Sequence, residues 1–448
     1  MKLVFVVCLR THLLSMEPMI VWGRKSGFHV SVFFANNYNM AELDAERIME
    51  VGCNVLFTPN RHKSLLSRIL ICDYAGVPLR RFWRTARHLL QVRWFYRRLF
   101  KKLGADVVVI PEENIGYLST IVVKAAHSAY AKCMVVPYTI DNPQEAAEAY
   151  YQRRAFQVFP DGSATKEHHR EVFAAWFPQW TRTHKGVTIF RFPWRIVFAF
   201  ELLRLAPPNP WQNTCSFADA VCVESEAISK MHKKSGVDAS KIHVIGSVVL
   251  DQMARLAKEA DFHKAVMLEE LGLDPSRPVF LVALPPDQFN TGREDCEFVD
   301  HSAVVAFWLE TLAATGWNVA VNLHPHLKPK DIDFGSWTNV KYCARPTAEV
   351  IPLCDVFVAS ISATIRWAIA CGKTVINHDL YLYRYDDYIG APGVIHLETK
   401  AQFAAEVARV AQEVPRAVPH ADWGILDGKS GERLLNLLSS LTSSSPPS

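Results

Sequence analysis

The sequence lacks several features that are typical of small zinc modules and of integral membrane proteins. Its 448 residues include 10 cysteines but no Cys-x-x-Cys pair, and closely spaced thiolates are what a structural zinc site requires. Cys8, Cys222 and Cys371 lie inside apolar runs, which indicates buried thiols in a reducing compartment. No run reaches the ~18 uncharged apolar residues of a membrane-spanning helix. We therefore expect neither a zinc module nor an integral membrane protein.

Extremes of composition are also missing. The counts of glycine (20) and proline (25) are near average, which excludes collagen-like and low-complexity chains. Half of the residues are hydrophobic and 21% are charged, so the chain can bury a large core and is not disordered. The apolar N-terminal run meets Arg10 at once, which favours a first strand over a signal peptide. At ~100–200 residues per domain, the length indicates two or three domains.

What the sequence does contain is an alternation of short apolar runs and helical stretches. The runs are mostly rich in Val, Ile and Phe, which is typical of strands buried on both faces of a parallel sheet. The predicted strands form two series: 3–9, 30–34, 54–57, 106–110, 132–136 and 219–223, then 279–283, 318–323, 340–342, 356–359, 374–377 and 394–396. Such alternation implies right-handed crossovers. We therefore predict an α/β protein with two Rossmann-like, doubly wound domains facing across a cleft.

The boundary between the two predicted domains lies near residue 272. Residues 251–271 are predicted to form a single helix that leads into a linker containing Pro and Gly. The prediction is a first domain of residues 1–272, a second of residues 273–432, and a helix end with a disordered tail over 433–448. An aromatic and basic insertion at about 156–210 would cover an acceptor site, touch lipid headgroups or form a buried lid.

Two histidines follow the predicted strand 318–323. Ligands of doubly wound sheets bind outside the carboxyl ends of the strands, so residues at these positions are candidates for a site. His324 and His326 occupy such positions on either side of a proline that stiffens the turn. An imidazole there can donate to a phosphate or to a departing anion.

Three hydroxyl side chains follow the predicted strand 356–359. Ser360, Ser362 and Thr364 lie where a helix, 363–371, is predicted to begin. A helix start has unpaired backbone N–H groups and a dipole that favours an anion. One hydroxyl suffices to cap a helix, so three in five residues favour a phosphate-binding site.

Four more residues are predicted to contact the substrate. His378 and Asp379 follow the predicted strand 374–377 and are expected to face the cleft. Gly246 and Ser247 lie where the chain crosses between the domains, and are expected to approach the donor from that hinge.

Carboxylates follow two strands of the first series. Glu112 and Glu113 come after strand 106–110, and Asp141 comes after strand 132–136. A carboxylate at such a position is a natural general base for an acceptor hydroxyl. The spacing does not choose among the three.

The excess positive charge of the chain is concentrated in one segment. Nine Lys and Arg side chains and no acid lie between residues 80 and 102, so removing the segment would change the net charge from +4 to −5. Its apolar residues are predicted to share one helical side: Phe82, Ala86, Leu89, Leu90, Phe95, Leu99 and Leu103. Such a helix can lie on an anionic membrane or be a core helix with a basic solvent face, whereas no motif favours nucleic acid.

The two-domain layout and two segments of the chain resemble a known fold family. The two-domain layout, residues 245–251 (Ile-Gly-Ser-Val-Val-Leu-Asp) and residues 368–373 (Ala-Ile-Ala-Cys-Gly-Lys) resemble those of GT-B glycosyltransferases. They also resemble the non-hydrolysing UDP-N-acetylglucosamine 2-epimerases, which share that fold. Residues 423–431 are similar to a segment of polysaccharide-synthesis proteins.

One departure bears on the choice between branches of this fold. The epimerases carry a Ser-Gly-Gly-x-Gln-Glu-Glu run, and many UDP-sugar transferases have a Glu for the ribose, whereas this chain has no acid between Val356 and Asn377. A His-Pro motif followed by a Ser-rich motif resembles bacterial capsule and sialyl- or Kdo-type transferases, and CDP-polyol phosphotransferases. By that resemblance His324 and the hydroxyls of residues 360–364 hold the phosphates of a nucleotide.

The resemblance implies a metal-independent glycosyltransferase that moves a sugar from a nucleotide-activated donor to a surface-polysaccharide or lipid-linked acceptor, as in capsule biosynthesis. It implies no cofactor besides the donor, and a cytoplasmic protein, peripheral on the inner face of the plasma membrane if the basic segment binds lipid. A nucleotide-sugar 2-epimerase and a CDP-polyol phosphotransferase are the alternatives.

Overall fold

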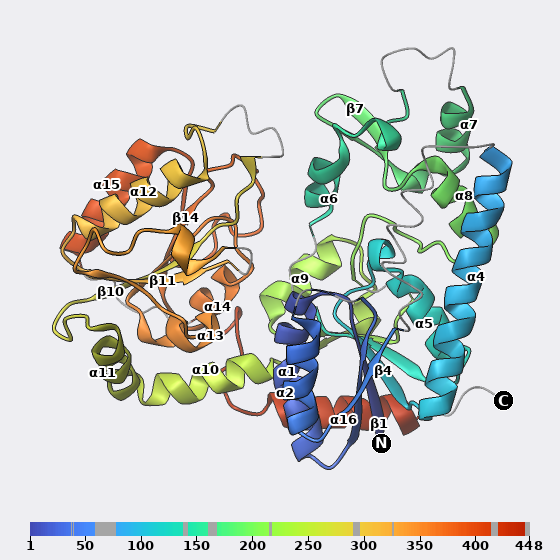
Figure 1. The fold of residues 1–448 in the computed structure, drawn as a ribbon, viewed down its shortest axis with the longest axis horizontal. Helices are drawn as coiled ribbons and strands as arrows, with labels where there is room; N and C mark the ends of the chain where they lie inside the picture. Colours follow the sequence, from blue (N-terminus) through green and yellow to red (C-terminus); the bar gives the residue numbers. More distant parts are fainter. Residues whose placement is uncertain are drawn as a thin grey trace. The chain divides into compact units, whose positions relative to one another are not determined.

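The computed structural model describes residues 1–36, 38, 40–58, 78–137, 142–159, 168–214, 217–289, 296–324, 327–413 and 420–443. The chain forms two compact units (Figure 1). Unit 1 comprises Met1–Val223, Ile228–Ile245 and Glu432–Ser448, and unit 2 comprises Glu224–Ala227 and Gly246–Gly431.

The units differ from the predicted domains at their edges. Residues 246–272, expected in the first domain, belong to unit 2, where α10 (Val248–Lys258) packs against α13 (Thr347–Val350). The chain returns to unit 1 at Glu432, because Leu434, Leu437 and Leu438 are buried in the unit 1 core.

Unit 1 is built on a parallel sheet of seven strands in the order β3-β2-β1-β4-β5-β8-β9. The strands are β1 (Lys2–Val7), β2 (His29–Phe34), β3 (Asn54–Phe57), β4 (Val107–Ile110), β5 (Lys132–Val135), β8 (Ala220–Val223) and β9 (Ile242–Val244). Every residue of β4 and of β8 is buried, as expected of central strands covered on both faces.

The helices of unit 1 follow its strands in the chain, as crossover connections require. They are α1 (Arg10–Lys25), α2 (Ala41–Glu50), α4 (Pro78–Leu103), α5 (Ser119–His127), α6 (Pro143–Tyr150), α7 (His168–Trp176), α8 (Trp194–Leu202), α9 (Glu226–Lys234) and α16 (Ser430–Ser443), with short 3-10 turns at Ile115–Tyr117, Arg154–Phe156, Pro178–Trp180 and Ala239–Lys241.

The aromatic insertion packs onto its neighbours in unit 1, because Ile189 clusters with Ala147 and Trp211 and the ring of Phe198 contacts Phe82 of α4. An antiparallel hairpin of β6 (Thr181–His184) and β7 (Val187–Phe190) lies between α7 and α8 in the sequence. Trp180, Phe190 and Phe200 are at most 1% exposed, so they are packing residues, whereas Trp176 is 63% exposed.

Unit 2 is built on a parallel sheet of six strands in the order β12-β11-β10-β13-β14-β15. The strands are β10 (Val279–Leu284), β11 (Asn318–Leu323), β12 (Val340–Tyr342), β13 (Val356–Ala359), β14 (Thr374–His378) and β15 (Val394–Leu397). Besides α10 and α13, the helices are α11 (Ala260–Leu271), α12 (His301–Ala313), α14 (Ile365–Ala370) and α15 (Lys400–Gln412), with 3-10 turns at Pro329–Asp331 and Ile351–Leu353. All six strands lie within two residues of their predicted bounds, and this is the α/β architecture of doubly wound sheets that the sequence predicts.

The predicted helix over 251–271 is two helices in the structure. The chain leaves helical geometry at Glu259, with φ −120° and ψ 35°, and α11 begins directly after it. Neither Gly nor Pro marks this position, so no local sequence signal indicated the break.

Among the residues that the structure describes, no helix has the length and apolar content that crossing a membrane would need.

Candidate functional site

The order of the strands in unit 2 defines where a ligand-binding site is expected. Counted along the chain, the sheet runs 3-2-1-4-5-6, and the winding reverses between its first strand, β10, and its fourth, β13. The crevice at such a switch point, beyond the carboxyl ends of the strands, is where doubly wound sheets bind ligands. Ser360 follows β13 directly and therefore lies at this point.

The segment after β13, residues 360–364, is a tightly bonded turn that we call the hydroxyl loop. The hydroxyl groups of Ser362 and Thr364 are 2.8 Å apart, and the backbone N–H of Thr364 donates to Ser362 Oγ at 3.3 Å. Ile361 has φ 44°, in the left-handed region that a β-branched residue rarely adopts. The side chain of Asn377 holds this conformation by accepting the N–H of Ile361 at 2.9 Å.

One hydroxyl of this loop has no hydrogen-bond partner among the described residues although its oxygen atom is buried. This atom is Ser360 Oγ. A buried polar atom without a partner costs free energy, and such atoms are rare in folded proteins. Ser360 is therefore the hydroxyl that is best placed to bind a ligand group.

Side chains behind the hydroxyl loop fix its position in unit 2. The hydroxyl of Tyr388 donates to the carbonyl oxygen of Ser362 at 3.0 Å. Arg366, 4% exposed, forms an ion pair with Glu224 at 2.7 Å, and Trp367 Nε1 donates to the same carboxylate at 3.2 Å. These contacts attach the hydroxyl loop and the first residues of α14 to the rest of unit 2.

The helix after the hydroxyl loop is shorter than predicted. It was expected over residues 363–371, whereas α14 spans Ile365–Ala370, which is six residues. Its N-cap residue is Thr364, and no side chain caps it by a hydrogen bond. A helix of this length contributes little dipole, so phosphate binding here would depend on the hydroxyls instead.

His324 follows β11, and one strand separates it from the hydroxyl loop. Because β10 lies between β11 and β13, the two carboxyl ends are about 10 Å apart, at ~4.8 Å per strand. His324 is partly exposed, and its carbonyl oxygen accepts the N–H of Leu327 at 2.8 Å. His326 lies outside the described residues.

The placement of His378 corrects the expectation that it faces a ligand. His378 is the last residue of β14 and is 0% exposed, stacked among aromatic rings of the unit 2 core. Its Nδ1 accepts the indole N–H of Trp308 at 3.0 Å. Burial, together with the nearby His396, lowers its pKa to about 3. A neutral core histidine is the role that these contacts support.

Asp379 is also buried rather than accessible. Its two carboxylate oxygens accept the backbone N–H groups of Tyr383 at 3.0 Å and Arg384 at 2.6 Å. Burial raises the pKa of this carboxyl group. Asp379 thus orders the turn that follows β14, because both of its carboxylate oxygens are bonded to the backbone of that turn.

Gly246 and Ser247 begin unit 2 at the point where the chain leaves unit 1. Gly246 has φ 76°, a conformation that glycine adopts without strain. Ser247 caps α10, since its Oγ accepts the N–H of Leu250 at 3.1 Å. Both residues have structural roles where the chain crosses between the units. Their contact with a donor stays a prediction. The predicted cleft between the domains also stays a prediction.

In unit 1, Glu112 lies at the corresponding switch point. The sheet order again reverses between β1 and β4, and Glu112 comes shortly after β4. Its Oε1 is 3.4 Å from Nε2 of His12, in the first turn of α1. Glu112 is 3% exposed and His12 1%, and Asn114 donates to Glu112 Oε2 at 3.4 Å. A carboxylate and an imidazole thus lie together under the carboxyl edge.

Glu113 has a different role from its neighbour. It is 1% exposed, and its carboxylate accepts the backbone N–H groups of Phe217 at 2.7 Å and Ala218 at 3.4 Å. These bonds anchor the segment that leads into β8, so Glu113 is engaged in the fold. Asp141, the third candidate base, lies outside the described residues.

Two residues of these sites were missed by the sequence reasoning. Glu112 was selected because it follows a strand by two residues. His12 follows β1 by five residues, so the same rule would include it if its range were extended to five residues. Asn377 is inside β14, where no rule of that kind applies, and only the hydrogen bond to Ile361 reveals it.

No cluster of three or more His, Cys, Asp or Glu side chains within the described part of the chain is arranged to hold a metal ion.

No protein-family model matches the chain, and no curated protein matches its sequence. Solved structures match nearly all of it. A UDP-GlcNAc 2-epimerase from Neisseria meningitidis, bound to UDP-GlcNAc, is 11% identical with a TM-score of 0.56, covering 98% of this chain and 100% of that chain. The calicheamicin glycosyltransferase CalG4 is 12% identical with a TM-score of 0.53, covering 100% of this chain and 99% of that one. The wall teichoic acid polymerase TagF is 10% identical with a TM-score of 0.53, covering 98% of this chain and 88% of that one. Together with the two parallel sheets, these likenesses show that the chain has the GT-B fold.

Proposed function

We propose that this protein is a glycosyltransferase that moves a sugar from a nucleotide-activated donor to a polysaccharide or lipid-linked acceptor. The observation that carries the proposal is the buried Ser360 Oγ, which has no hydrogen-bond partner in the described part of the chain and lies at the switch point of the unit 2 sheet. A hydroxyl donor at that place suits an anionic ligand group. Solved structures with this fold have been determined with UDP-GlcNAc and with UDP bound, which supports a nucleotide donor.

The donor's phosphates would bind at the hydroxyl loop. Ser360, Ser362 and Thr364 supply hydroxyl donors, and the imidazole of His324 supplies an N–H from the second strand end. When the bond between the sugar and the phosphate breaks, its electron pair stays on the phosphate oxygen. Fixed donors aimed at that oxygen stabilise the developing charge, and none of them is a metal ion.

The acceptor hydroxyl would be activated in unit 1. Its oxygen forms the new bond to the sugar, and its proton passes to the carboxylate of Glu112. His12, 3.4 Å from that carboxylate, holds it in place. Because Glu112 is 3% exposed, the proposal requires that the acceptor open a path to it.

A thermal-shift panel of CMP, CDP, UDP, GDP and ADP tests the donor site. A ligand that binds only the native state raises its stability by about 2.7 kcal/mol at a hundredfold excess over Kd. We expect one nucleotide to stabilise the protein and Ser360→Ala to weaken that effect. Ser336→Ala, in the connection that leads into β12, is the matched control and should leave it unchanged. No stabilisation by any nucleotide at millimolar concentration would overturn the proposal.

Turnover tests the catalytic assignments. We expect His324→Ala and Glu112→Gln each to lower kcat for sugar transfer by at least about 100-fold, within the range of general acid–base and electrostatic contributions. Unchanged thermal unfolding of His324→Ala would show that the loss is chemical. Near-normal donor cleavage by this variant would contradict its role at the leaving phosphate.

A nucleotide-sugar 2-epimerase is the second candidate, because three epimerase structures match with TM-scores above 0.5. Incubation with UDP-N-acetylglucosamine alone separates the two activities. An epimerase converts the sugar with no acceptor present, whereas a transferase requires the acceptor. The missing acid between Val356 and Asn377 departs from the epimerases and from many UDP-sugar transferases alike, so the choice between the two activities depends on this experiment.

A further inference from the structure

Helix α4 extends well past the sheet that it covers. Its 26 residues span about 39 Å, whereas the four residues of β4, which follows it, span about 13 Å. The C-terminal half packs on the sheet, where Phe33 contacts the rings of Phe95 and Tyr96. Because α4 leads into the amino end of β4, its N-terminal half projects beyond the carboxyl edge and runs beside α8 (Figure 1).

The buried side of α4 differs from the predicted one. Phe82, Ala86 and Leu89 are buried as predicted, but Leu90 is 48% exposed, and Phe95 and Leu99 are only half-buried. Val92, Tyr96 and Phe100 complete the buried side instead. The reason is that α4 packs against the sheet and against α5 and α8, which turns a different stripe inward.

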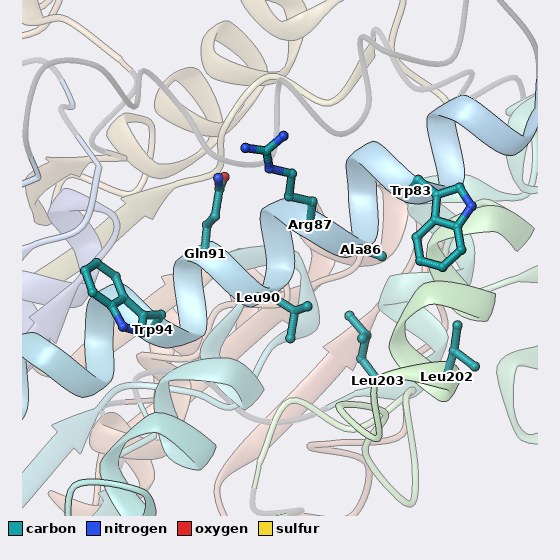
Figure 2. A pocket seen from close by; sticks show the side chains of 8 residues that line it. All are labelled: Trp83, Ala86, Arg87, Leu90, Gln91, Trp94, Leu202 and Leu203. Atoms are coloured by element: carbon teal, nitrogen blue, oxygen red, sulfur yellow. The ribbon is translucent and has the colours of Figure 1, made fainter.

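The outer face of α4 carries exposed aromatic and aliphatic side chains. Trp83 is 61% exposed, Leu90 48% and Trp94 60%, and Leu202 of α8 is 54% exposed beside them. With Arg87 and Leu203 they line a cavity of about 380 Å³ between the two helices. Figure 2 shows Leu90 directed toward Leu203, with Trp83 and Trp94 at the two ends. We call this surface the tryptophan face.

Basic side chains lie among these apolar ones. At 100° per residue, Arg87, Arg97, Arg98 and Lys101 fall within about 60° of Trp83 around the helix. All four are exposed, and the Arg98 guanidinium lies 5.3 Å from the ring of Trp94. The segment 80–102 contains nine basic residues and no acid, so nothing on α4 neutralises this charge.

We infer that the tryptophan face docks on the surface of an anionic phospholipid bilayer. Tryptophan rings favour the level of the lipid headgroups, with their apolar part inward, and Arg and Lys side chains around them pair with headgroup phosphates. Leu90 and Leu202 would insert between the two rings.

Other occupants fit these observations less well. Trp83 and Trp94 are eleven residues apart, about 16 Å along the helix, which is too far to stack neighbouring bases of a nucleic acid. A second copy would bring the same basic stripe against itself, and like charges repel.

Vesicle flotation tests this inference without any substrate, so its outcome is independent of the proposed function. We expect the protein to float with vesicles of phosphatidylcholine and phosphatidylglycerol. With phosphatidylcholine vesicles alone, or in 1 M NaCl, it should remain unbound in the bottom fraction. The double variant Trp83→Ala and Trp94→Ala should lower the partition coefficient at least about tenfold. Arg97→Gln with Lys101→Gln should lower it for anionic vesicles.

Matched variants in unit 2 serve as controls. Phe262→Ala removes a ring that is 64% exposed. The double variant Lys258→Gln and Lys330→Gln removes two exposed charges. Both control variants should bind vesicles like the wild type. Circular dichroism checks that every variant is folded. The inference would be overturned if the control variants lost vesicle binding to the same extent, if the protein bound neutral vesicles, or if it did not float at all. A wild-type dimer that dissociates in the tryptophan variant would also overturn it.

Discussion

The side-chain oxygen of Asn377, in β14, accepts the backbone N–H of Ile361 at 2.9 Å and so holds the turn after the neighbouring strand β13. Asn377 is 1% exposed, and its amide nitrogen lies 3.3 Å from Nδ1 of His396. One buried side chain thereby connects three adjacent strands of unit 2 and fixes Ile361 at its positive φ.

We predict that Asn377→Ala loosens the hydroxyl loop. Removing the acceptor leaves the partly buried N–H of Ile361 without this bond, which costs about 0.5–1.5 kcal/mol. Hydrogen exchange should show faster exchange of the Ile361 amide. Asn318→Ala removes an equally buried asparagine at the start of β11 and should destabilise unit 2 without this local effect. Equal protection of the Ile361 amide in the two variants would contradict the role assigned to Asn377.

His378 should make the stability of unit 2 depend on pH. Its folded pKa of about 3 is below the ordinary value near 6.5, so the unfolded chain binds more protons between these values. The contribution is complete above pH 6.5 and is lost as the pH falls toward 3, by about 2–3 kcal/mol at pH 4.5.

Thermal unfolding of His378→Gln across pH 4.5–7.5 checks this prediction. Glutamine keeps an acceptor for the Trp308 indole but does not titrate, so the fall in stability should be smaller. Asp379, whose raised pKa gives a contribution of opposite sign, is present in both proteins and cancels in the comparison. Parallel curves for the two proteins would refute the assignment.

Glu224→Gln should destabilise unit 2 strongly. It leaves the guanidinium of Arg366, 4% exposed, without its counter-charge, and breaking a buried pair costs about 3–5 kcal/mol. Glu413→Gln, which breaks the exposed pair with Arg409, should cost less than about 0.5 kcal/mol. Replacing both Glu224 and Arg366 by leucine should recover part of the loss in urea unfolding, and the absence of recovery would count against a charge effect.

Gly424 and Gly23 should respond in opposite ways to alanine. A Cβ on Gly424 would overlap the Cβ of Ala370, so Gly424→Ala should cost about 1–3 kcal/mol from overpacking. A Cβ on Gly23, inside α1, meets only ordinary contacts at 3.5 Å, so Gly23→Ala should stabilise by up to about 1 kcal/mol. The two melting temperatures should therefore move apart, and a neutral Gly424→Ala would show that the contact relaxes freely.

The strands were predictable because their signal is local. Runs such as Val-Val-Val-Ile in β4 are buried on both faces, and such a run reveals a central strand without knowledge of its partners. The break at Glu259 was not predictable, because neither Gly nor Pro marks it. The late start of α14 was not predictable either, because the turn before it is held by the bond to Asn377, which lies in a strand distant in the sequence.

The candidate site was predictable only as a set of positions. His324, Ser360 and Glu112 all follow strands, and the structure places the latter two at switch points of their sheets. The same rule also selected His378 and Asp379, which are buried. It failed for them because a position after a strand does not tell whether the neighbouring elements cover the side chain.

The sequence by itself determined two parallel sheets, the edge of each sheet where polar residues collect, and a basic helix without acids, since each follows from periodicity or charge along the chain. Only the tertiary structure decided that His12 meets Glu112 across about a hundred residues, and that Trp83, Leu90 and Trp94 face outward. It also decided that Ser360 Oγ has no hydrogen-bond partner among the residues that the structure describes. The physical reason is that accessibility and pairing depend on which elements pack together, and residues distant in the chain make those contacts.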